Sequence, residues 1–186
     1  MKIAFVIFDD FTFLDFIGFY DVVTRLKSMG FLPEMNWDIC AMSERISDDK
    51  GLCVIADKVN MPLSSYDIVF VPGGRGTRKL QNDNEFINWI QSAKNTPLKI
   101  SVCTGSLILG AAGFLKNKKA TTHKNAMNDL KKYTNKAEFQ RIIDEENIIT
   151  GSGVATSIDL GLYLVQKLSN SETREKIAKQ MDYPYK

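Results

Sequence analysis

Short, almost uninterrupted apolar runs recur along the chain, and the segments between them carry apolar residues at helical spacing. Such runs occupy residues 2–8, 67–71 and 98–102, and residues 37–42 form a further candidate strand. Continuous apolar strands are typical of a parallel sheet that is covered on both faces. We therefore predict that these four segments are the principal strands of one buried sheet.

The intervening segments predict helices. Leu14, Ile17, Phe19, Val22 and Val23 recur at helical spacing, and Gly30 is placed to end that helix. Asn82 and Glu85 have the spacing of a capping box, which predicts a helix N-terminus there. Further helices are expected at residues 106–112, 126–133, 153–168 and 169–181, of which 153–168 is apolar on nearly every face and is predicted to be buried.

Three weaker segments complete the pattern. Residues 51–59 predict an edge hairpin, residues 120–122 a short extended piece, and residues 139–144 with 147–150 a hairpin or two short strands. Strands that alternate with helices indicate a doubly wound α/β sandwich, in which ligands bind at the carboxyl ends of the strands. That edge would gather residues 9–15, 72–75 and 103–104, with His123 or residues 151–153 as further candidates.

Cys103 lies where the strand 98–102 turns sharply into a helix, with Gly105 two residues later. This arrangement is typical of a nucleophile elbow. The helix N-terminus offers free N–H groups and a positive dipole end, which favour a thiolate. Cys103 is therefore the candidate nucleophile. The alternative is a buried structural cysteine, because free cysteine is among the most buried residue types.

Two loops offer N–H groups to a reacting substrate. Gly73 and Gly74 lack side chains, so their N–H groups, with that of Thr104, could form an oxyanion hole. The alternative is that the Pro-Gly-Gly sequence is only a tight turn. We expect the Thr104 side chain to cap the helix. Arg75 is a candidate for binding an anionic substrate, although an exposed loop arginine needs no such role.

Asp15 is expected at the start of the first helix, on the same edge of the sheet. Burial and a nearby thiolate would raise the pKa of its carboxyl, which would make it a proton donor. The alternative is an ordinary first-turn aspartate that complements the helix dipole. His123 is the alternative general base, and it follows Cys103 by twenty residues, so an adjacent Cys-His dyad is excluded.

Composition narrows the classes of function. The chain has 186 residues with 24 basic and 22 acidic side chains, which predicts one domain over residues 1–186 and does not favour nucleic acid as a partner. No apolar run has the length of a membrane span, and the N-terminus does not resemble a signal peptide. An odd count of cysteines predicts reduced thiols and a cytoplasmic location. A single histidine excludes a multi-histidine metal site.

Several motifs together resemble the ThiJ/PfpI superfamily, which is related to class I glutamine amidotransferases. The resemblance is greatest to its isonitrile hydratase branch. The matching segments run in the expected order from one end of the chain to the other: Thr12–Gly18, Val71–Gly74, Val102–Ser106, Leu109–Gly113, Ala120–His123, Ile149–Gly153 and Met181–Pro184.

The resemblance implies a flavodoxin-like three-layer sandwich that forms a homodimer and needs no metal or organic cofactor. It implies that Cys103 and Asp15 are the catalytic pair, that Thr104 is part of the site, and that a small isonitrile is hydrated to an N-substituted formamide. The chain departs from the family pattern at Phe19 and Asp21, where proline and glutamate are usual. We expect Phe19 to alter the pocket wall beside Asp15.

Other functions remain open on the sequence alone. A glyoxalase-like or deglycase-like activity on reactive carbonyls also occurs in the superfamily. A non-enzymatic role, as a redox sensor or stress-associated chaperone, would use Cys103 as an accessible thiol of low pKa that is readily oxidised.

Overall fold

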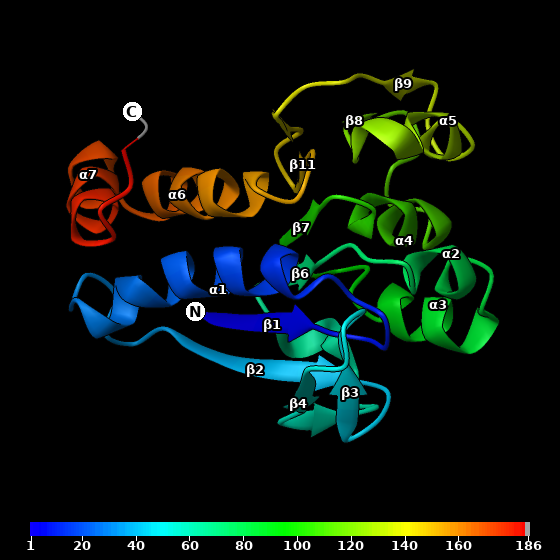
Figure 1. Cartoon of the computed structure of the whole chain (residues 1–186), viewed down its shortest axis with the longest axis horizontal. Coiled ribbons are helices and arrows are strands. Elements are labelled where there is room, and N and C mark those ends of the chain that lie inside the picture. The colour runs from blue at the N-terminus through cyan, green and yellow to red at the C-terminus, as the bar shows by residue number, and fades with distance from the viewer. Residues whose placement is uncertain (185–186) are drawn as a thin grey trace.

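A computed structural model describes residues 1–184 of the chain (Figure 1). Within these residues, a central seven-stranded sheet has the order β10-β11-β7-β6-β1-β2-β5. Its neighbours pair in parallel except for β10 and β11. The strands are β1 (Lys2–Val6), β2 (Asn36–Ala41), β5 (Lys58–Val59), β6 (Ile68–Val71), β7 (Leu98–Val102), β10 (Ile142–Asp144) and β11 (Ile148–Gly151).

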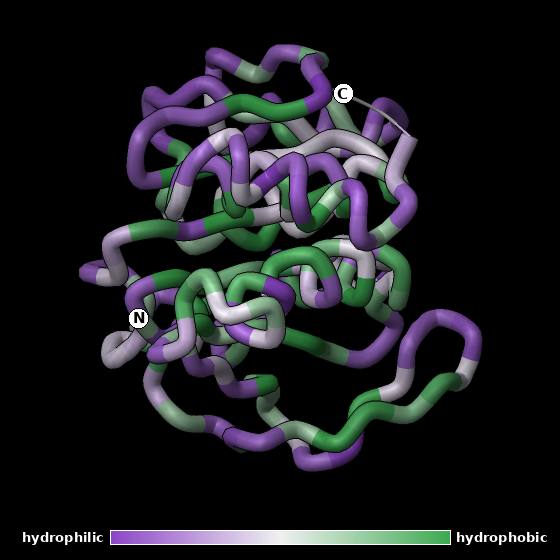
Figure 2. Tube along the Cα trace, turned by 90° about the vertical axis from the view of Figure 1, so that its left-hand side faces the viewer, coloured by the Kyte–Doolittle hydropathy of each residue, from purple (hydrophilic) through white to green (hydrophobic). Residues whose placement is uncertain are grey.

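Helices cover the sheet and surround its carboxyl edge. They are α1 (Phe13–Ser28), α2 (Thr77–Leu80), α3 (Asn84–Gln91), α4 (Gly105–Ala111), α5 (Met127–Leu130), α6 (Thr156–Leu168) and α7 (Ser171–Gln180), with short 3₁₀ turns at η1 (Leu63–Ser65) and η2 (Lys124–Ala126). Hydrophobic segments gather in the middle of the molecule, and hydrophilic ones lie mostly around it (Figure 2). The architecture confirms the predicted α/β flavodoxin-like sandwich.

The two faces of the sheet are set by the alternation of side chains along its strands. Phe5 and Phe70 are register partners on β1 and β6, and both rings contact Phe19 of α1. Phe19 is fully buried and stacks on Phe70 with 4.0 Å between ring centroids. Lys99 of β7 precedes Ile100, the register partner of Phe70, so its side chain points to the opposite face of the sheet. There it lies against the ring of Phe114, which follows α4. The expectation that Phe19 shapes a pocket wall is therefore wrong, because its ring belongs to the core.

Close packing of α1 on α6 holds the start of α1 in place. A Cβ built on Gly18 would lie 2.3 Å from the Ser157 hydroxyl oxygen, and one on Gly161 would lie 2.7 Å from Cβ of Val22. The helices therefore approach each other where side chains are absent. The Ser157 hydroxyl also donates to the backbone carbonyl of Leu14 at 3.0 Å. This bond fixes the helical turn that carries Asp15.

Two predicted features at the edges of elements are wrong. Residues 51–59 do not form a hairpin with each other: β4 (Cys53–Ile55) pairs antiparallel with β3 (Arg45–Ser47), whereas β5 joins the central sheet beside β2. The cap of α3 is Asp83 rather than Asn82, because the Asp83 carboxylate accepts from the N–H groups of the second and third residues after it.

The last third of the chain agrees more closely with the pattern. Strands β10 and β11 form the expected antiparallel hairpin. A small parallel pair, β8 (Lys119–Ala120) with β9 (Lys136–Ala137), was not expected. Helix α6 begins at Thr156, three residues later than predicted, and seven of its thirteen residues are buried, which agrees with the prediction of a buried helix. Tyr163 is exposed. Within residues 1–184, no helix combines the length and hydrophobicity that crossing a membrane requires.

Candidate active site

Cys103 occupies the turn between β7 and α4, with a backbone φ of +55° in the left-handed region. Its N–H donates to the carbonyl of Gly151 at 3.0 Å. Its own carbonyl accepts from the hydroxyls of Thr122 at 2.8 Å and Ser106 at 3.2 Å. A Cβ at Gly105 would lie 2.2 Å from the carbonyl oxygen of Val71, which explains the glycine in the turn. These contacts confirm the predicted elbow.

Gly73 lies between the Asp15 carboxyl and the elbow. Its N–H donates to Oδ2 of Asp15 at 3.0 Å. A Cβ built on Gly73 would lie 2.7 Å from that same oxygen, 2.8 Å from Cβ of Cys103 and 2.6 Å from the backbone nitrogen of Thr104. Three segments that are remote in sequence therefore meet at one position where no side chain fits. Asp15, predicted from the sequence, is brought directly beside Cys103.

Burial dominates the electrostatics of the pair. Asp15 is fully buried, and burial raises the pKa of its carboxyl to about 7, with a smaller contribution from the Asp49 carboxylate. The Cys103 thiol and the Gly73 N–H, as hydrogen-bond donors, partly oppose this rise. The other oxygen, Oδ1, makes no hydrogen bond of normal geometry within residues 1–184. A buried carboxyl of this kind can hold a proton near neutral pH.

Burial disfavours the thiolate form of Cys103. Only 6% of the residue is exposed, and burial, together with the negative charge of Asp15, raises the pKa of the thiol to about 12. Hydrogen bonding by Thr104 opposes this rise without overcoming it. Burial therefore opposes the thiolate that the N-terminus of α4 favours, and a reactive thiolate at Cys103 stays a prediction. Asp15 and Cys103 titrate together as a pair that shares protons.

Thr104 joins the elbow to the Pro-Gly-Gly loop. The Gly74 N–H donates to its hydroxyl oxygen at 3.0 Å, and that hydroxyl faces the Gly74 carbonyl at 3.2 Å. The Thr104 side chain makes no cap bond to α4, so the predicted cap is wrong. The N–H groups of Gly73 and Gly74 already donate to Asp15 and Thr104. An oxyanion hole built from these groups stays a prediction that requires a substrate to displace both acceptors.

His123 lines the same pocket. Among the hydrogen bonds of residues 1–184, none joins His123 to the Cys103 thiol. Its Nδ1 accepts from the N–H of Asn125 at 3.2 Å, which ties the ring to the turn η2. Its role as a base stays a prediction. The pocket over the elbow measures about 260 Å³ and is lined by Thr12, Gly74, Arg75, Arg78, Cys103, Thr104, His123 and Val154.

Some residues of this pocket were not expected. Arg78 lies on α2, three residues after Arg75 in the preceding turn, and this short spacing is the signal in the sequence that the two share a surface. Val154 lies in the loop before α6, and nothing in its sequence neighbourhood indicates a pocket. Within residues 1–184, no three histidine, cysteine, aspartate or glutamate side chains gather as a metal site requires.

Comparison with known proteins places this geometry in a family. Residues 1–167 match the DJ-1/PfpI family. A relative named isonitrile hydratase, from Pseudomonas putida, is 32% identical over 185 residues, which cover 98% of this chain and 78% of that protein. A relative named glutathione-independent glyoxalase DJ-1, from Schizosaccharomyces pombe, is 28% identical over 122 residues, which cover 64% of this chain and 63% of that protein.

Solved structures share the fold. A ThiJ/PfpI family protein from Pseudomonas syringae superposes with a TM-score of 0.88 at 29% identity, covering 100% of this chain and 76% of that chain. Drosophila melanogaster DJ-1beta superposes with a TM-score of 0.84 at 17% identity, covering 99% and 98% of the two chains. The family match spans both the elbow of Cys103 and the helix of Asp15. The chain belongs to the DJ-1/PfpI family, also called ThiJ/PfpI.

Proposed function

We propose that the chain is a cysteine-dependent enzyme that hydrates a small isonitrile to an N-substituted formamide. One observation carries the proposal: a fully buried carboxyl with a pKa of about 7 is packed beside the thiol at a nucleophile elbow. Isonitrile hydration needs a nucleophile and a proton at the same carbon atom, and this pair supplies both. The similarity to the Pseudomonas putida isonitrile hydratase over 98% of the chain supports the choice of substrate.

The first step is addition of the thiol across the terminal carbon of the isonitrile. The reactive state is a pair holding one proton, so that the Asp15 carboxylate takes the proton of the Cys103 thiol as sulfur approaches the substrate. The C–S bond forms, the carbon–nitrogen triple bond becomes a double bond, and Asp15 passes the proton to carbon. The product is a thioimidate on Cys103, and Asp15 is again a carboxylate.

The second step is hydrolysis of the thioimidate. Asp15 removes a proton from water as the water oxygen adds to the thioimidate carbon, and then passes this proton to nitrogen. The C–S bond then breaks as the added hydroxyl becomes the formamide carbonyl, its proton passes through Asp15 to sulfur, and the N-substituted formamide leaves. One water molecule is consumed, and the thiol and carboxylate are restored. Helix α1 and the elbow need not move apart between steps, because the same two groups serve both.

The test is turnover of cyclohexyl isonitrile to its formamide, with the Cys103→Ala variant as the blank. We expect the parent to form N-cyclohexylformamide at a rate that the variant does not reach, because no other thiol lines the pocket within residues 1–184. Product is measured by chromatography and mass spectrometry. Equal rates for parent and variant, or no product from either, would count against the proposal.

A second candidate is glyoxalase-like chemistry on a reactive carbonyl, which the sequence left open as an alternative. A thiol beside a proton-carrying carboxyl also suits attack on an aldehyde, and the Schizosaccharomyces pombe relative is named a glyoxalase. Methylglyoxal consumption by the same two proteins, followed as lactate formation, separates the candidates. Turnover of methylglyoxal without turnover of the isonitrile would replace the first proposal by this one.

Redox sensing by Cys103 has less support. A redox-sensing thiol is ordinarily exposed and of low pKa. Cys103 is buried, and its pKa is raised to about 12. Assembly as a homodimer, a cytoplasmic location and a single domain over the whole chain stay predictions, and size-exclusion chromatography with light scattering would test the first of them.

We expect His123→Ala to retain most of the parent's turnover. The imidazole bonds to its own turn through Nδ1, and the proton transfers above are assigned to Asp15. The readout is kcat and KM for the isonitrile, with a urea unfolding curve to check that the variant is folded. A loss of kcat beyond about tenfold in a folded variant would return His123 to the mechanism as a base.

A further inference from the structure

The pocket over Cys103 is lined by basic side chains and, among residues 1–184, by no carboxylate. Arg75, Arg78 and His123 all line it. An adjoining hollow of about 290 Å³ shares His123 and Val154 with this pocket and adds Lys124 and Arg141. The charged side chains that line the two hollows are therefore all cationic.

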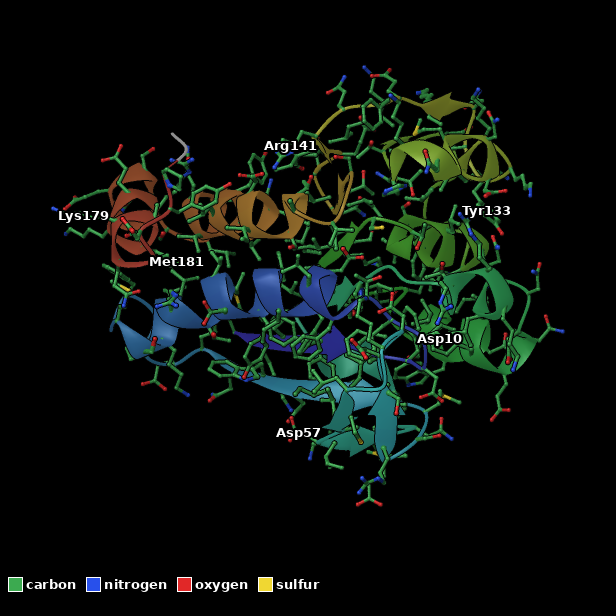
Figure 3. All side chains as sticks on the ribbon, viewed as in Figure 1. Asp10, Asp57, Tyr133, Arg141, Lys179 and Met181 are labelled. Atoms are coloured by element: carbon green, nitrogen blue, oxygen red, sulfur yellow. The ribbon has the colours of Figure 1, made fainter. Side chains whose placement is uncertain are left out.

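Most N–H donors of the Arg75 guanidinium are available to a ligand. Its side chain is 73% exposed, and its ion pair with Asp10, itself exposed, measures 3.5 Å, which is at the limit of a direct contact. The same nitrogen donates to the backbone carbonyl of Asp49 at 3.2 Å. A guanidinium has five N–H donors in a planar fork, so most of them are left for another acceptor. Asp10, the ion-pair partner of Arg75, lies in the loop after β1 and is labelled in Figure 3.

The acidic neighbours do not cancel this charge inside the pocket. Arg78 pairs with Asp129 at 2.8 Å, but Asp129 is shared with Lys132 and does not line the pocket. The Asp49 carboxylate is bound by Lys50. In the adjoining hollow, Arg141, labelled in Figure 3, is bound by Asp159, whereas Lys124 has no ion-pair partner within residues 1–184.

We propose that the site selects substrates that carry a carboxylate, which Arg75 binds at the mouth while the reactive carbon lies over Cys103. The proposal deepens the function above and rests on it for the identity of the reactive group. A guanidinium fork matches a carboxylate in shape and charge, and Arg78 and Lys124 add attraction from either side. The preferred substrate class is thus a short isonitrile that carries a carboxylate. If the glyoxalase-like activity is the correct one, the corresponding substrates are short oxo acids.

The first test compares two isonitriles that differ in charge and in one methyl group. Isocyanoacetate carries a carboxylate, and methyl isocyanoacetate is its neutral ester. We expect kcat/KM to be about tenfold higher for the acid, since a hydrogen-bonded charge pair at a partly exposed site is worth roughly this factor. Arg75→Gln should remove most of that preference. Raising the salt concentration should reduce it in the parent, because exposed charges are screened.

Lys79→Gln is the matched control. Lys79 lies on the same helix as Arg78, and its substitution removes the same charge, but Lys79 does not line the pocket over Cys103. It lines a second hollow, of which Arg75 also forms part. We expect this variant to keep the preference of the parent for the acid. Loss of the preference in both variants would indicate a general field of the protein, and a parent without any preference would overturn the proposal.

The second test needs no turnover, so it separates failure of this proposal from failure of the proposed function. Iodoacetate and iodoacetamide alkylate a thiol in the same way: the C–S bond forms, iodide leaves and the thiol proton passes to a base. The rate at Cys103 is read by peptide mass spectrometry, with the exposed Cys53 as the reference for reagent.

We expect Arg75→Gln to lower the ratio of iodoacetate rate to iodoacetamide rate at Cys103 by about tenfold and Lys79→Gln by less than twofold. An unchanged ratio in Arg75→Gln would overturn the anion site even if isonitriles are turned over. A lowered ratio in a protein that turns over no isonitrile would keep the anion site and reject only the isonitrile chemistry.

Discussion

Replacing Asp15 with Asn is expected to lower isonitrile turnover by about 10²–10⁴-fold in a protein that remains folded. The amide has the shape of the carboxyl, and its oxygen can still accept from the Gly73 N–H. It cannot take the thiol proton or deliver it to carbon. Because burial has raised the pKa of the thiol to about 12, no other route to a thiolate is at hand near neutral pH.

The pH profile gives this prediction a second readout. With the carboxyl pKa raised to about 7 by burial, the singly protonated pair becomes populated as the pH rises through 7. The parent's kcat/KM should therefore increase between pH 6 and 8, and the residual rate of Asp15→Asn should lack this step. A parent whose rate falls over the same interval would mean that the protonated carboxyl is the active form.

Stability should change in the opposite direction to activity. A carboxyl whose pKa is raised from 3.8 to about 7 is stabilising while it holds its proton, and this contribution is lost as the pH rises from about 4 through 7. The loss is on the order of 4 kcal/mol. About 2–3 kcal/mol of this loss falls between pH 5 and pH 8, and urea unfolding at these two pH values should show it in the parent and not in Asp15→Asn.

Asp21→Asn is the control for both measurements. Asp21 lies on the same helix, is exposed and pairs with Arg25 at 2.7 Å. The same substitution there should leave turnover and the pH dependence of stability as in the parent. If Asp21→Asn reproduced the effects of Asp15→Asn, the cause would be a general change in α1 rather than the loss of a buried acid.

Gly73→Ala is the second large effect that we expect. The added Cβ would lie within 2.8 Å of Asp15 Oδ2, of Cys103 Cβ and of the Thr104 backbone nitrogen, and two of these are not free ends of a flexible chain. The loop or the elbow must shift. A displacement of about 1 Å between reacting groups costs roughly a hundredfold in rate, and overpacking of this kind costs about 1–3 kcal/mol of stability.

Gly153→Ala provides the comparison. It stands near the same pocket, but its Cβ would meet only the His123 ring, at 3.8 Å, which is ordinary contact. We expect kcat for this variant to stay within about twofold of the parent, while Gly73→Ala loses activity at a temperature where circular dichroism shows it folded. Full activity in Gly73→Ala would mean that the distance between acid and thiol is not critical.

The sequence predicts the frame of the molecule well, because that frame depends on local patterns. Strands β1, β6 and β7 are buried on both faces, so their apolar runs are continuous and easy to identify. The elbow is also a local signal, since a strand, a Cys and a Gly follow in direct order. Asp15 could be predicted because it lies at the start of the helix that follows the first strand. In a parallel sheet this position lies at the same edge as Cys103.

The features that were missed depend on partners remote in sequence. Nothing in residues 45–47 indicates that they, rather than residues 57–59, pair with β4. The Thr104 hydroxyl engages Gly74 of another loop instead of capping its own helix. The pKa of Cys103 follows from the depth of burial and the charge of Asp15, neither of which is visible in the residues that flank it.

The left-handed backbone at Cys103 sets stability and function against each other. An L-residue with φ near +55° pays about 1–2 kcal/mol that glycine would not. The residue that best suits the fold at position 103 is therefore the one that has no thiol. Selection for thermal stability of this turn alone would therefore favour glycine at position 103. Under the proposed function, the thiol of Cys103 is what position 103 gains in exchange for that cost.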